Sequence, residues 1–240
     1  STDWDPNRLG STTYKGDKND PQRHFIDMVN FADKMVGQII KQLKKSGVRE
    51  NTVLIFTGDN GTDKPIVTRW NGTEVVGGKG SMSDTGTRVP LIVNWPAGIK
   101  KPGRITDELV EFTDMMPTLC EISGTSLPKN HPADGASIVP VLQNKKDIRK
   151  KDWIYIWYRN QVMIRNKKYS LLAKQDGNSA TLTRYKGQFN GKELTDQKMN
   201  KTERRIKEEF EDILARMAKT RLSSASAEGK AMGLKNKSNR

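Results

Sequence analysis

Hydrophobic and polar positions follow a helical pattern through residues 25–43. Apolar side chains recur there at steps of three and four residues, the spacing that places them on one face of an α-helix. The pattern predicts a helix with one continuous buried stripe, and Gly47 is expected to end it. The stripe comprises Phe25, Met28, Val29, Ala32, Met35, Val36, Ile39, Ile40 and Leu43.

Two short apolar runs, at residues 52–57 and 90–95, show no alternation of apolar and polar positions. Such runs are typical of strands covered on both faces in a parallel sheet. The helix and the strands together predict α/β layering. Between the strands, residues 62–87 are polar and rich in glycine. This segment is too long for a simple connector, and long segments of that kind are usually functional or disordered.

A shorter helical pattern occupies residues 113–122, with Thr113 as the expected N-cap and Gly124 as the expected end. The only cysteine, Cys120, lies in this pattern among apolar neighbours. We therefore expect it to be an inert core residue rather than a nucleophile. A single cysteine also excludes an internal disulfide framework and a multi-cysteine metal site.

The last part of the chain has a different pattern. Residues 153–158, 161–165 and 169–173 predict three strands, the last two joined as a hairpin through residues 166–168. A helix is predicted over residues 201–219. Its apolar face, which could cover such a sheet, consists of Ile206, Phe210, Ile213, Leu214 and Met217.

These patterns predict the domain organisation. We expect an α/β domain over residues 1–144 and a small antiparallel sheet and helix subdomain over residues 145–219. Residues 220–240 are expected to form a basic, disordered tail. Residues 1–20, rich in Asp, Asn, Gly, Ser and Thr, predict an irregular surface segment.

The charge balance raises the possibility of a polyanionic partner. Lysine and arginine number 42 against 28 aspartate and glutamate residues, a formal net charge of +14. Much of the excess lies in residues 145–151 and 219–240, and no aromatic residues interleave the tail for base stacking. A solvated tail and loop is therefore favoured over a dedicated polyanion surface, and no specific nucleic acid is expected. No apolar run approaches the ~20 residues of a membrane span, so none is expected.

The strongest candidate chemistry follows the first predicted strand. Asp59 and Asn60, flanked by Gly58 and Gly61, offer a carboxylate and an amide carbonyl, hard oxygen donors that suit Ca²⁺ or Mg²⁺. The glycines would let the backbone approach a ligand closely. An ordinary Asp-Asn-Gly turn is the alternative, because these residues tolerate positive φ.

A second candidate is Lys79, which glycines bracket in the sequence Gly-Gly-Lys-Gly at residues 77–80. Its ammonium group could act as a compact charge for sulfate or phosphate oxygens. The pattern of a nucleotide-binding P-loop is absent. Arg88 could be another anion contact, but we favour a role in bracing the segment through an ion pair.

Other polar residues support less chemistry. His24 and His131 are predicted at the surface and form no visible dyad; a Ser-His-Asp triad stays open, but no Gly-x-Ser-x-Gly elbow suggests one. Asn71 and Asn200 each begin an Asn-x-Thr glycosylation pattern, which matters only in a secreted eukaryotic context.

In their order and spacing, these segments resemble the sulfatase family of the alkaline-phosphatase-like superfamily. The resemblance implies an alkaline-phosphatase-like α/β sandwich, of which this chain would be the C-terminal part. Its motifs are Asn-Thr-Val-Leu-Ile-Phe-Thr-Gly-Asp-Asn-Gly at residues 51–61, Gly-Lys-Gly at 78–80, Gly-Thr-Arg-Val-Pro at 86–90, Phe-Thr-Asp-Met-Met-Pro-Thr-Leu at 112–119 and Asp-Gly at 134–135.

Sulfatases hydrolyse sulfate esters with a formylglycine nucleophile beside a bound Ca²⁺. The resemblance implies that Asp59 and Asn60 are calcium ligands and that Lys79 binds the sulfate group of an aryl or carbohydrate sulfate. The Cys/Ser-x-Pro/Ala-x-Arg motif that yields the formylglycine does not occur here, and Cys120 is followed by Glu-Ile-Ser-Gly. We therefore expect the nucleophile upstream of residue 1 in a longer parent, and no turnover by this chain alone.

The family is mostly exported or lysosomal, so a periplasmic, secreted or lysosomal location is expected. The sequence leaves open the identity of the sulfate ester and the oligomeric state. Two alternatives also stay open: a phosphoesterase of the same superfamily, and a non-catalytic relative that binds sulfated polysaccharide or another polyanion.

Overall fold

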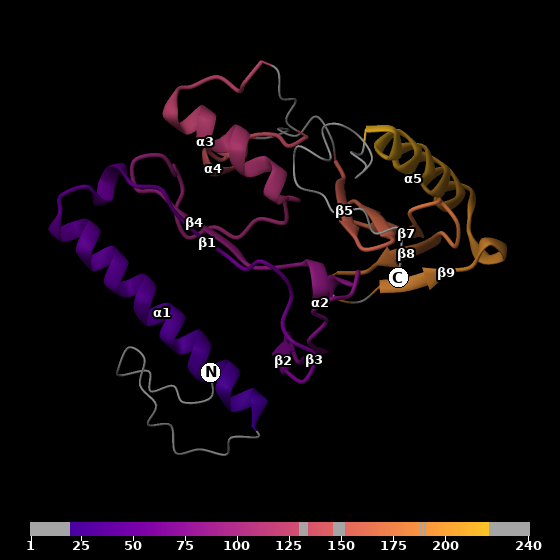
Figure 1. The fold of residues 1–240 in the computed structure, drawn as a ribbon, viewed down its shortest axis with the longest axis horizontal. Helices are drawn as coiled ribbons and strands as arrows, with labels where there is room; N and C mark the ends of the chain where they lie inside the picture. The colour runs from indigo at the N-terminus through magenta and orange to yellow at the C-terminus, as the bar shows by residue number, and fades with distance from the viewer. Residues whose placement is uncertain (1–19, 130–133, 146–151, 188, 190, 221–240) are drawn as a thin grey trace, which may run out of the picture. The chain divides into compact units, whose positions relative to one another are not determined.

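A computed structural model describes residues 20–129, 134–145, 152–187, 189 and 191–220 (Figure 1). The chain divides into two compact units, residues 1–150 and 151–240. The predictions for residues 1–19, for most of the basic cluster at 145–151 and for the tail from residue 221 lie outside the described residues. Among the described helices, none is long and apolar enough to cross a membrane.

The first described element of the first unit is helix α1 (Pro21–Lys45), which is longer at both ends than predicted. The Asp20 side chain caps it by accepting the backbone N–H of Arg23 at 3.0 Å, and Gly47 follows its end with a φ of 70°. The expected buried stripe is wrong in part, because Met28 and Val29 are half exposed. The helical period identifies the apolar face of a helix, but it cannot say whether another element covers that face.

The two predicted strands exist, but they pair antiparallel rather than parallel. After a 3₁₀ turn (Arg49–Asn51), β1 (Leu54–Thr57) pairs with β4 (Leu91–Asn94), and Phe56 lies opposite Ile92. Both of these side chains are exposed, so the strands are not covered on both faces in the described structure. A run without alternation is typical of strands with apolar neighbours on both faces, but it shows neither whether those neighbours are present nor the direction of the neighbouring strand.

The polar segment between these strands contains structure that the sequence analysis missed. Strands β2 (Val67–Trp70) and β3 (Thr73–Val76) form a hairpin, and a single helical turn, α2 (Asp84–Thr87), precedes β4. Asn71 and Gly72 connect the hairpin with φ values of 47° and 79°. Positive φ at both positions is what a tight two-residue hairpin needs, and Asn-Gly satisfies it with little strain.

A 3₁₀ turn (Phe112–Asp114) leads into α3 (Met115–Ser123), which Gly124 ends as predicted with a φ of 69°. Thr113 is not the N-cap, because Glu111 and Asp114 form the capping box instead. Helix α3 is followed by the short α4 (Val139–Leu142).

Two buried polar side chains attach the segment after α3 to the start of the helix. The Asp114 carboxylate accepts the Ala136 N–H at 2.8 Å, and the Thr118 hydroxyl accepts the Ile138 N–H at 3.0 Å. A Cβ atom at Gly135 would collide with the backbone of Thr113. The Phe-Thr-Asp-Met-Met-Pro-Thr-Leu and Asp-Gly motifs are therefore parts of one packed structure, in which buried polar groups are paired.

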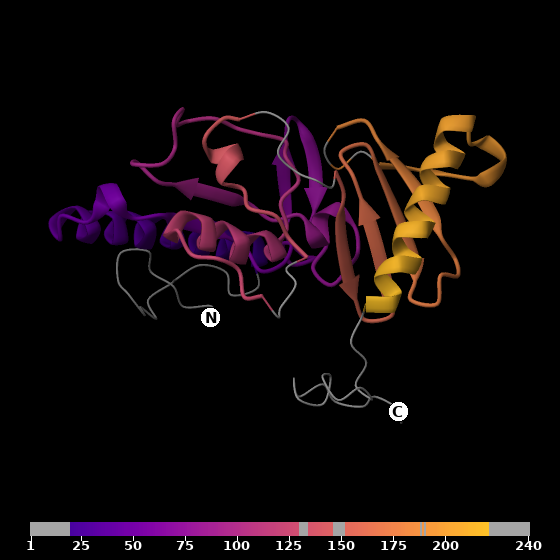
Figure 2. The same cartoon turned by 90° about the horizontal axis from the view of Figure 1, so that it is seen from above.

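The second unit is a five-stranded antiparallel sheet in chain order, β5-β6-β7-β8-β9. The three predicted strands and the hairpin between β6 and β7 are confirmed, whereas the last two strands were missed. A 3₁₀ turn (Asp196–Lys198) leads to α5 (Lys201–Thr220), which lies across one face of the sheet (Figure 2). The strands are β5 (Ile154–Tyr158), β6 (Gln161–Arg165), β7 (Tyr169–Lys174), β8 (Thr181–Tyr185) and β9 (Gly191–Leu194).

The predicted apolar face of α5 forms the core of this unit with the sheet. Phe210, Ile213 and Leu214 are buried, and Ile206 and Met217 pack beside them. From the sheet, β6, β7 and β8 contribute Val162, Ile164, Leu171, Ala173 and Leu182. The helix is thus held by the stripe that its sequence pattern identified.

Candidate functional site

The turn after β1 presents both predicted metal ligands. Asp59 and Asn60 are exposed, and the Asn60 Nδ2 donates a hydrogen bond to the Asp59 Oδ1 at 2.8 Å. Gly61 is buried, and its N–H donates to the Gly86 carbonyl at 2.9 Å. A Cβ atom at Gly61 would collide with the Thr85 carbonyl, so only glycine permits this close contact of two backbones.

The same turn holds the segment that carries Lys79. The Lys79 N–H donates to the Thr62 carbonyl at 2.9 Å, and the Gly77 N–H donates to the Ile66 carbonyl at 2.8 Å. A Cβ atom at Gly77 would collide with the Asp63 carbonyl. These contacts bring Lys79 beside Thr62, two residues after Asn60. The Lys79 side chain is exposed.

Hydroxyl groups of the next turn fix the shape of the lysine segment. The Ser81 Oγ donates to the Gly78 carbonyl at 2.7 Å and lies 2.7 Å from the Ser83 Oγ, which is 3.0 Å from the Thr85 Oγ1. Gly86 packs against the carbonyls of Ser81 and Gly78 so closely that a side chain would not fit. This network of serine and threonine hydroxyl groups therefore helps to hold the backbone around Lys79 in place.

The arrangement suits recognition of a metal ion and an oxyanion. A carboxylate, an amide and an ammonium group project from two loops whose backbones are bonded together. Within the described residues, no group of three or more His, Cys, Asp or Glu side chains is placed to hold a metal. The donors Asp59 and Asn60 fit a hard cation chemically, but they would supply only one side of the ~6–8 oxygen ligands that Ca²⁺ takes.

The remaining sequence candidates stay outside this arrangement. Arg88 is exposed, and its proposed ion pair stays a prediction; its backbone N–H donates to the Asp84 carbonyl at 2.9 Å. His24 is half-buried in the first turn of α1, and His131 lies outside the described residues. Cys120 is in α3 as predicted, but it is half-buried rather than a full core residue.

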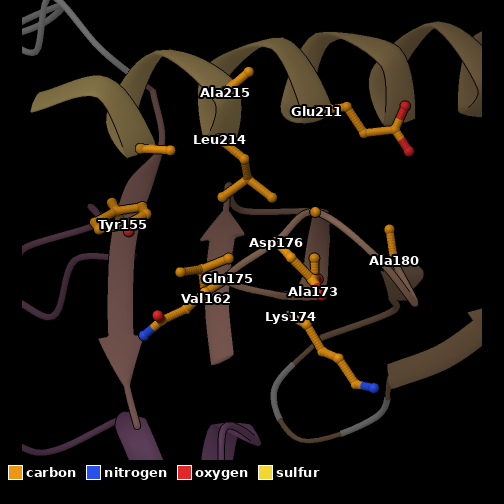
Figure 3. A pocket seen from close by; sticks show the side chains of 12 residues that line it. Tyr155, Val162, Ala173, Lys174, Gln175, Asp176, Ala180, Glu211, Leu214 and Ala215 are labelled. Atoms are coloured by element: carbon orange, nitrogen blue, oxygen red, sulfur yellow. The ribbon is translucent and has the colours of Figure 1, made fainter. Parts of the chain in front are cut away.

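The second unit contains a cavity of about 290 Å³ between α5 and the sheet, which the sequence analysis missed (Figure 3). Leu214 points into it from the helix, and Tyr155 and Val162 line it from the strands. Asp176 also lines the cavity. Its carboxylate accepts the Asn178 N–H at 2.9 Å, and this hydrogen bond lowers the pKa of Asp176. Ala215 and Ala218 of α5, both exposed, also line the cavity.

Two protein families match the sequence of this chain. The sulfatase family matches residues 3–125, and the C-terminal region of N-sulphoglucosamine sulphohydrolase matches residues 77–227. The chain belongs to the sulfatase family. The family match contains the turn of Asp59 and Asn60 as well as Lys79.

Curated sulfatases of bacteria and animals are similar to part of this sulfatase chain. An uncharacterized sulfatase of Escherichia coli, YdeN, is 39% identical over 128 residues, which cover 51% of this chain and 21% of YdeN. An ulvan-active sulfatase of Formosa agariphila is 31% identical over 143 residues, covering 55% of this chain and 25% of that enzyme. The mouse steryl-sulfatase is 30% identical over 137 residues, covering 55% and 22%. The matched part thus spans about a quarter of these relatives.

Solved structures confirm the alkaline-phosphatase-like fold. A putative sulfatase of Bacteroides thetaiotaomicron superposes with a TM-score of 0.62 at 23% identity, covering 89% of this chain and 44% of that one. A phosphonate monoester hydrolase of Silicibacter pomeroyi gives a TM-score of 0.60 at 18% identity, covering 82% and 40%. At these identities the likeness establishes the fold, which sulfatases share with a hydrolase of phosphorus esters.

Proposed function

We propose that the Asp59 turn and the Lys79 segment form the metal- and sulfate-binding part of a sulfuric ester hydrolase. The observation that carries the proposal is the pair of backbone hydrogen bonds, Lys79 to Thr62 and Gly61 to Gly86, that join the two loops. Membership of the sulfatase family supports the same assignment. The chain covers only part of the length of its relatives, so the activity of the whole enzyme is part of this proposal.

Hydrolysis of a sulfate ester increases negative charge on the oxygens around sulfur. Fixed positive charges near those oxygens stabilise the transition state more than the ground state. Lys79 would donate to a sulfate oxygen, and its glycine neighbours would leave room for the ester. When bound, Ca²⁺ would polarise the sulfate group as a Lewis acid.

Asp59 and Asn60 would hold the calcium ion through one carboxylate and one amide oxygen. The present hydrogen bond between them turns the Asn60 NH₂ group toward Asp59, so its Oδ1 points away from that carboxylate. If the Asn60 amide turned over, its Oδ1 and the Asp59 carboxylate would both be free to hold the ion. Formylglycine, the nucleophile of the family, requires a motif that this chain lacks, so the residues named here bind and orient rather than attack sulfur.

A titration of the isotope-labelled chain tests the assignment without requiring turnover. Calcium should perturb the backbone amide resonances of residues 58–61, and inorganic sulfate should perturb those of residues 78–80. Lys79→Ala should weaken the sulfate response at least about tenfold, because a hydrogen bond to a charged group contributes ~1.5–3 kcal/mol. The calcium response should remain in this variant.

Lys64→Ala is the matched control, since Lys64 is exposed in the same region but outside the lysine segment. Asp63→Ala serves likewise for Asp59→Ala, which should abolish the calcium response. A sulfate response that is equal in Lys79→Ala and in the wild-type chain would contradict the proposal. A stronger response to inorganic phosphate than to sulfate would instead favour the phosphoesterase alternative.

A further inference from the structure

We propose that the end of the five-stranded sheet that carries Lys168, Lys186 and Lys192 binds a sulfated polysaccharide; we name it the lysine end. The three residues are exposed and belong to one compact unit. The choice of a sulfated partner rests on the proposed function, whereas the presence of an anion-binding surface rests on the geometry alone.

The topology brings the three lysines together from two connections. In an antiparallel sheet in chain order, the β6–β7 and β8–β9 connections lie at the same end. Lys168 lies in the first connection, Lys186 is the first residue of the second, and Lys192 is the second residue of β9. The Lys168 carbonyl accepts the Tyr185 N–H at 2.8 Å, which places Lys168 beside the residue that precedes Lys186.

Side-chain hydrogen bonds hold the backbone of the β6–β7 turn at this end. The Asn166 Oδ1 accepts the N–H groups of Lys168 at 2.9 Å and of Tyr169 at 2.7 Å, which closes the β6–β7 turn. Tyr185 is held in turn by Ser170, whose Oγ is 3.1 Å from the Tyr185 hydroxyl. Because the backbone of Lys168 is held in this way, less conformational entropy is lost when that lysine binds a polymer.

The positive charges at the lysine end are not balanced locally. In the described part of the chain, Lys168, Lys186 and Lys192 take part in no ion pair. Lys192 also lies directly opposite Arg184 across β8 and β9, an arrangement of like charges that destabilises a sheet. Arg184 is neutralised by Glu203 at 2.7 Å, which leaves the charge of Lys192 uncompensated.

Protection of an edge strand explains only part of this pattern. A lysine on an edge strand discourages pairing with other chains, and β9 is an edge strand. That role accounts for Lys192, but not for Lys168 and Lys186, which lie outside the strands. Two like charges opposite each other in a sheet, together with a cluster of lysines, are typical of a binding surface.

Two tyrosines at this end, Tyr169 and Tyr185, favour a polysaccharide over a nucleic acid, and the third aromatic residue there, Phe189, is half-buried in the β8–β9 connection. Tyr185 is covered by the Arg165 guanidinium, 3.9 Å from its ring centre, and Tyr169 packs against the core beneath α5. With one face of Tyr185 occupied by Arg165 and Tyr169 packed against the core, these two rings offer little surface to stacked bases, on which single-stranded nucleic acid sites rely. A sulfated polysaccharide needs only positioned cations, and lysines are suited to that as compact charges.

The test measures binding of fluorescein-labelled heparin to the full chain by fluorescence anisotropy over a series of NaCl concentrations. The triple variant Lys168→Ala, Lys186→Ala, Lys192→Ala should bind roughly tenfold more weakly, with a log–log salt slope smaller by about three. The matched control Lys41→Ala, Lys100→Ala, Lys101→Ala removes the same charge from exposed positions of the first unit and should bind like the wild-type chain. Circular dichroism confirms that both variants are folded.

Three outcomes would overturn the proposal: equal losses in the two triple variants, binding of unsulfated hyaluronan as strong as that of heparin, or tighter binding of oligo-dT than of heparin. Equal losses would mean that net charge rather than the lysine end attracts the polymer. Lys79→Ala should leave heparin binding unchanged. Failure of the lysine end is therefore distinguishable from failure of the sulfate site, which the titration with inorganic sulfate measures.

Discussion

At the scale of single residues, the chain uses small and polar side chains to fix its loops. Gly61, Gly77 and Gly86 permit backbone contacts that a Cβ atom would block. Asp114 and Thr118 bond the N–H groups of a distant segment. The sequence analysis identified Asp59, Asn60 and Lys79 as functional candidates, but it could not find these contacts, because they join residues that are far apart along the chain.

One exposed carboxylate has a clear electrostatic partner. The Lys207 Nζ donates to the Asp196 Oδ1 at 2.7 Å, and this hydrogen bond, with the attraction between the two charges, lowers the pKa of Asp196. A lowered folded-state pKa stabilises the fold above the unfolded pKa of ~4, and the contribution is lost as the pH falls through the folded value.

Lys207→Met should therefore raise the pKa of Asp196 toward its ordinary value. Carboxyl carbon chemical shifts, followed by NMR through an acid titration, measure this pKa directly. Lys198→Met, which removes an exposed lysine from the same 3₁₀ turn as Asp196, should leave the pKa of Asp196 nearly unchanged. An Asp196 pKa that does not rise in Lys207→Met would show that the ion pair is not formed in solution.

At the scale of elements, the sequence predicted helices better than it predicted sheet pairing. The periodic patterns of α1 and α5 extend over many residues and gave correct positions, because each turn repeats the same signal. Strands β8 and β9 were missed because polar residues interrupt their short apolar patterns. The β1–β4 pairing was mispredicted because strand direction depends on the chain's path rather than on local composition.

The start of α5 combines a helix cap with a buried ion pair. Asn200 and Glu203 bond each other's backbone N–H groups at 3.0 Å, and the Glu203 carboxylate, 2% exposed, also pairs with Arg184. This contact attaches the first turn of the helix to β8. Removing the carboxylate would leave the Asn200 N–H and the Arg184 guanidinium without their acceptor.

Glu203→Ala should lower the free energy of unfolding by about 2–3 kcal/mol, because a buried pair and a cap are lost together. A pair with both partners fully buried would cost more, but the Arg184 side chain is 35% exposed and can be rehydrated. Urea denaturation measures the change. Glu208→Ala on the exposed side of α5 should stay within ~0.5 kcal/mol of the wild-type value, and an equal effect of the two substitutions would contradict this assignment.

At the scale of the whole molecule, the alkaline-phosphatase-like fold was predictable from the order of a few motifs. Each motif is common alone, but together they mark the ends of strands and the buried contacts of one architecture. The surroundings of α1 and β1 could not be predicted, because burial depends on the elements that pack against them. Apolar side chains on both remain exposed in the described structure, including Met28 and Val29 of α1 and Phe56 of β1.

The catalytic capacity of the chain is a prediction at this scale. We expect no measurable hydrolysis of 4-nitrophenyl sulfate by the 240-residue chain, because it contains no Cys/Ser-x-Pro/Ala-x-Arg motif. The assay should be run with Ca²⁺ and after coexpression with a formylglycine-generating enzyme, with an intact sulfatase as positive control. Turnover that depends on formylglycine would show that the chain has a nucleophile outside the known motif.

The two Asn-Gly pairs of the first unit should age at different rates. Deamidation begins when the glycine nitrogen attacks the asparagine side chain, which needs a mobile, accessible backbone. Asn71 is exposed at the tip of the β2–β3 hairpin, whereas the nitrogen of Gly61, after Asn60, is buried and bonded to Gly86. During storage, isoaspartate should thus accumulate at the hairpin first, while the amide proposed to bind calcium is protected by the same backbone bond that positions it.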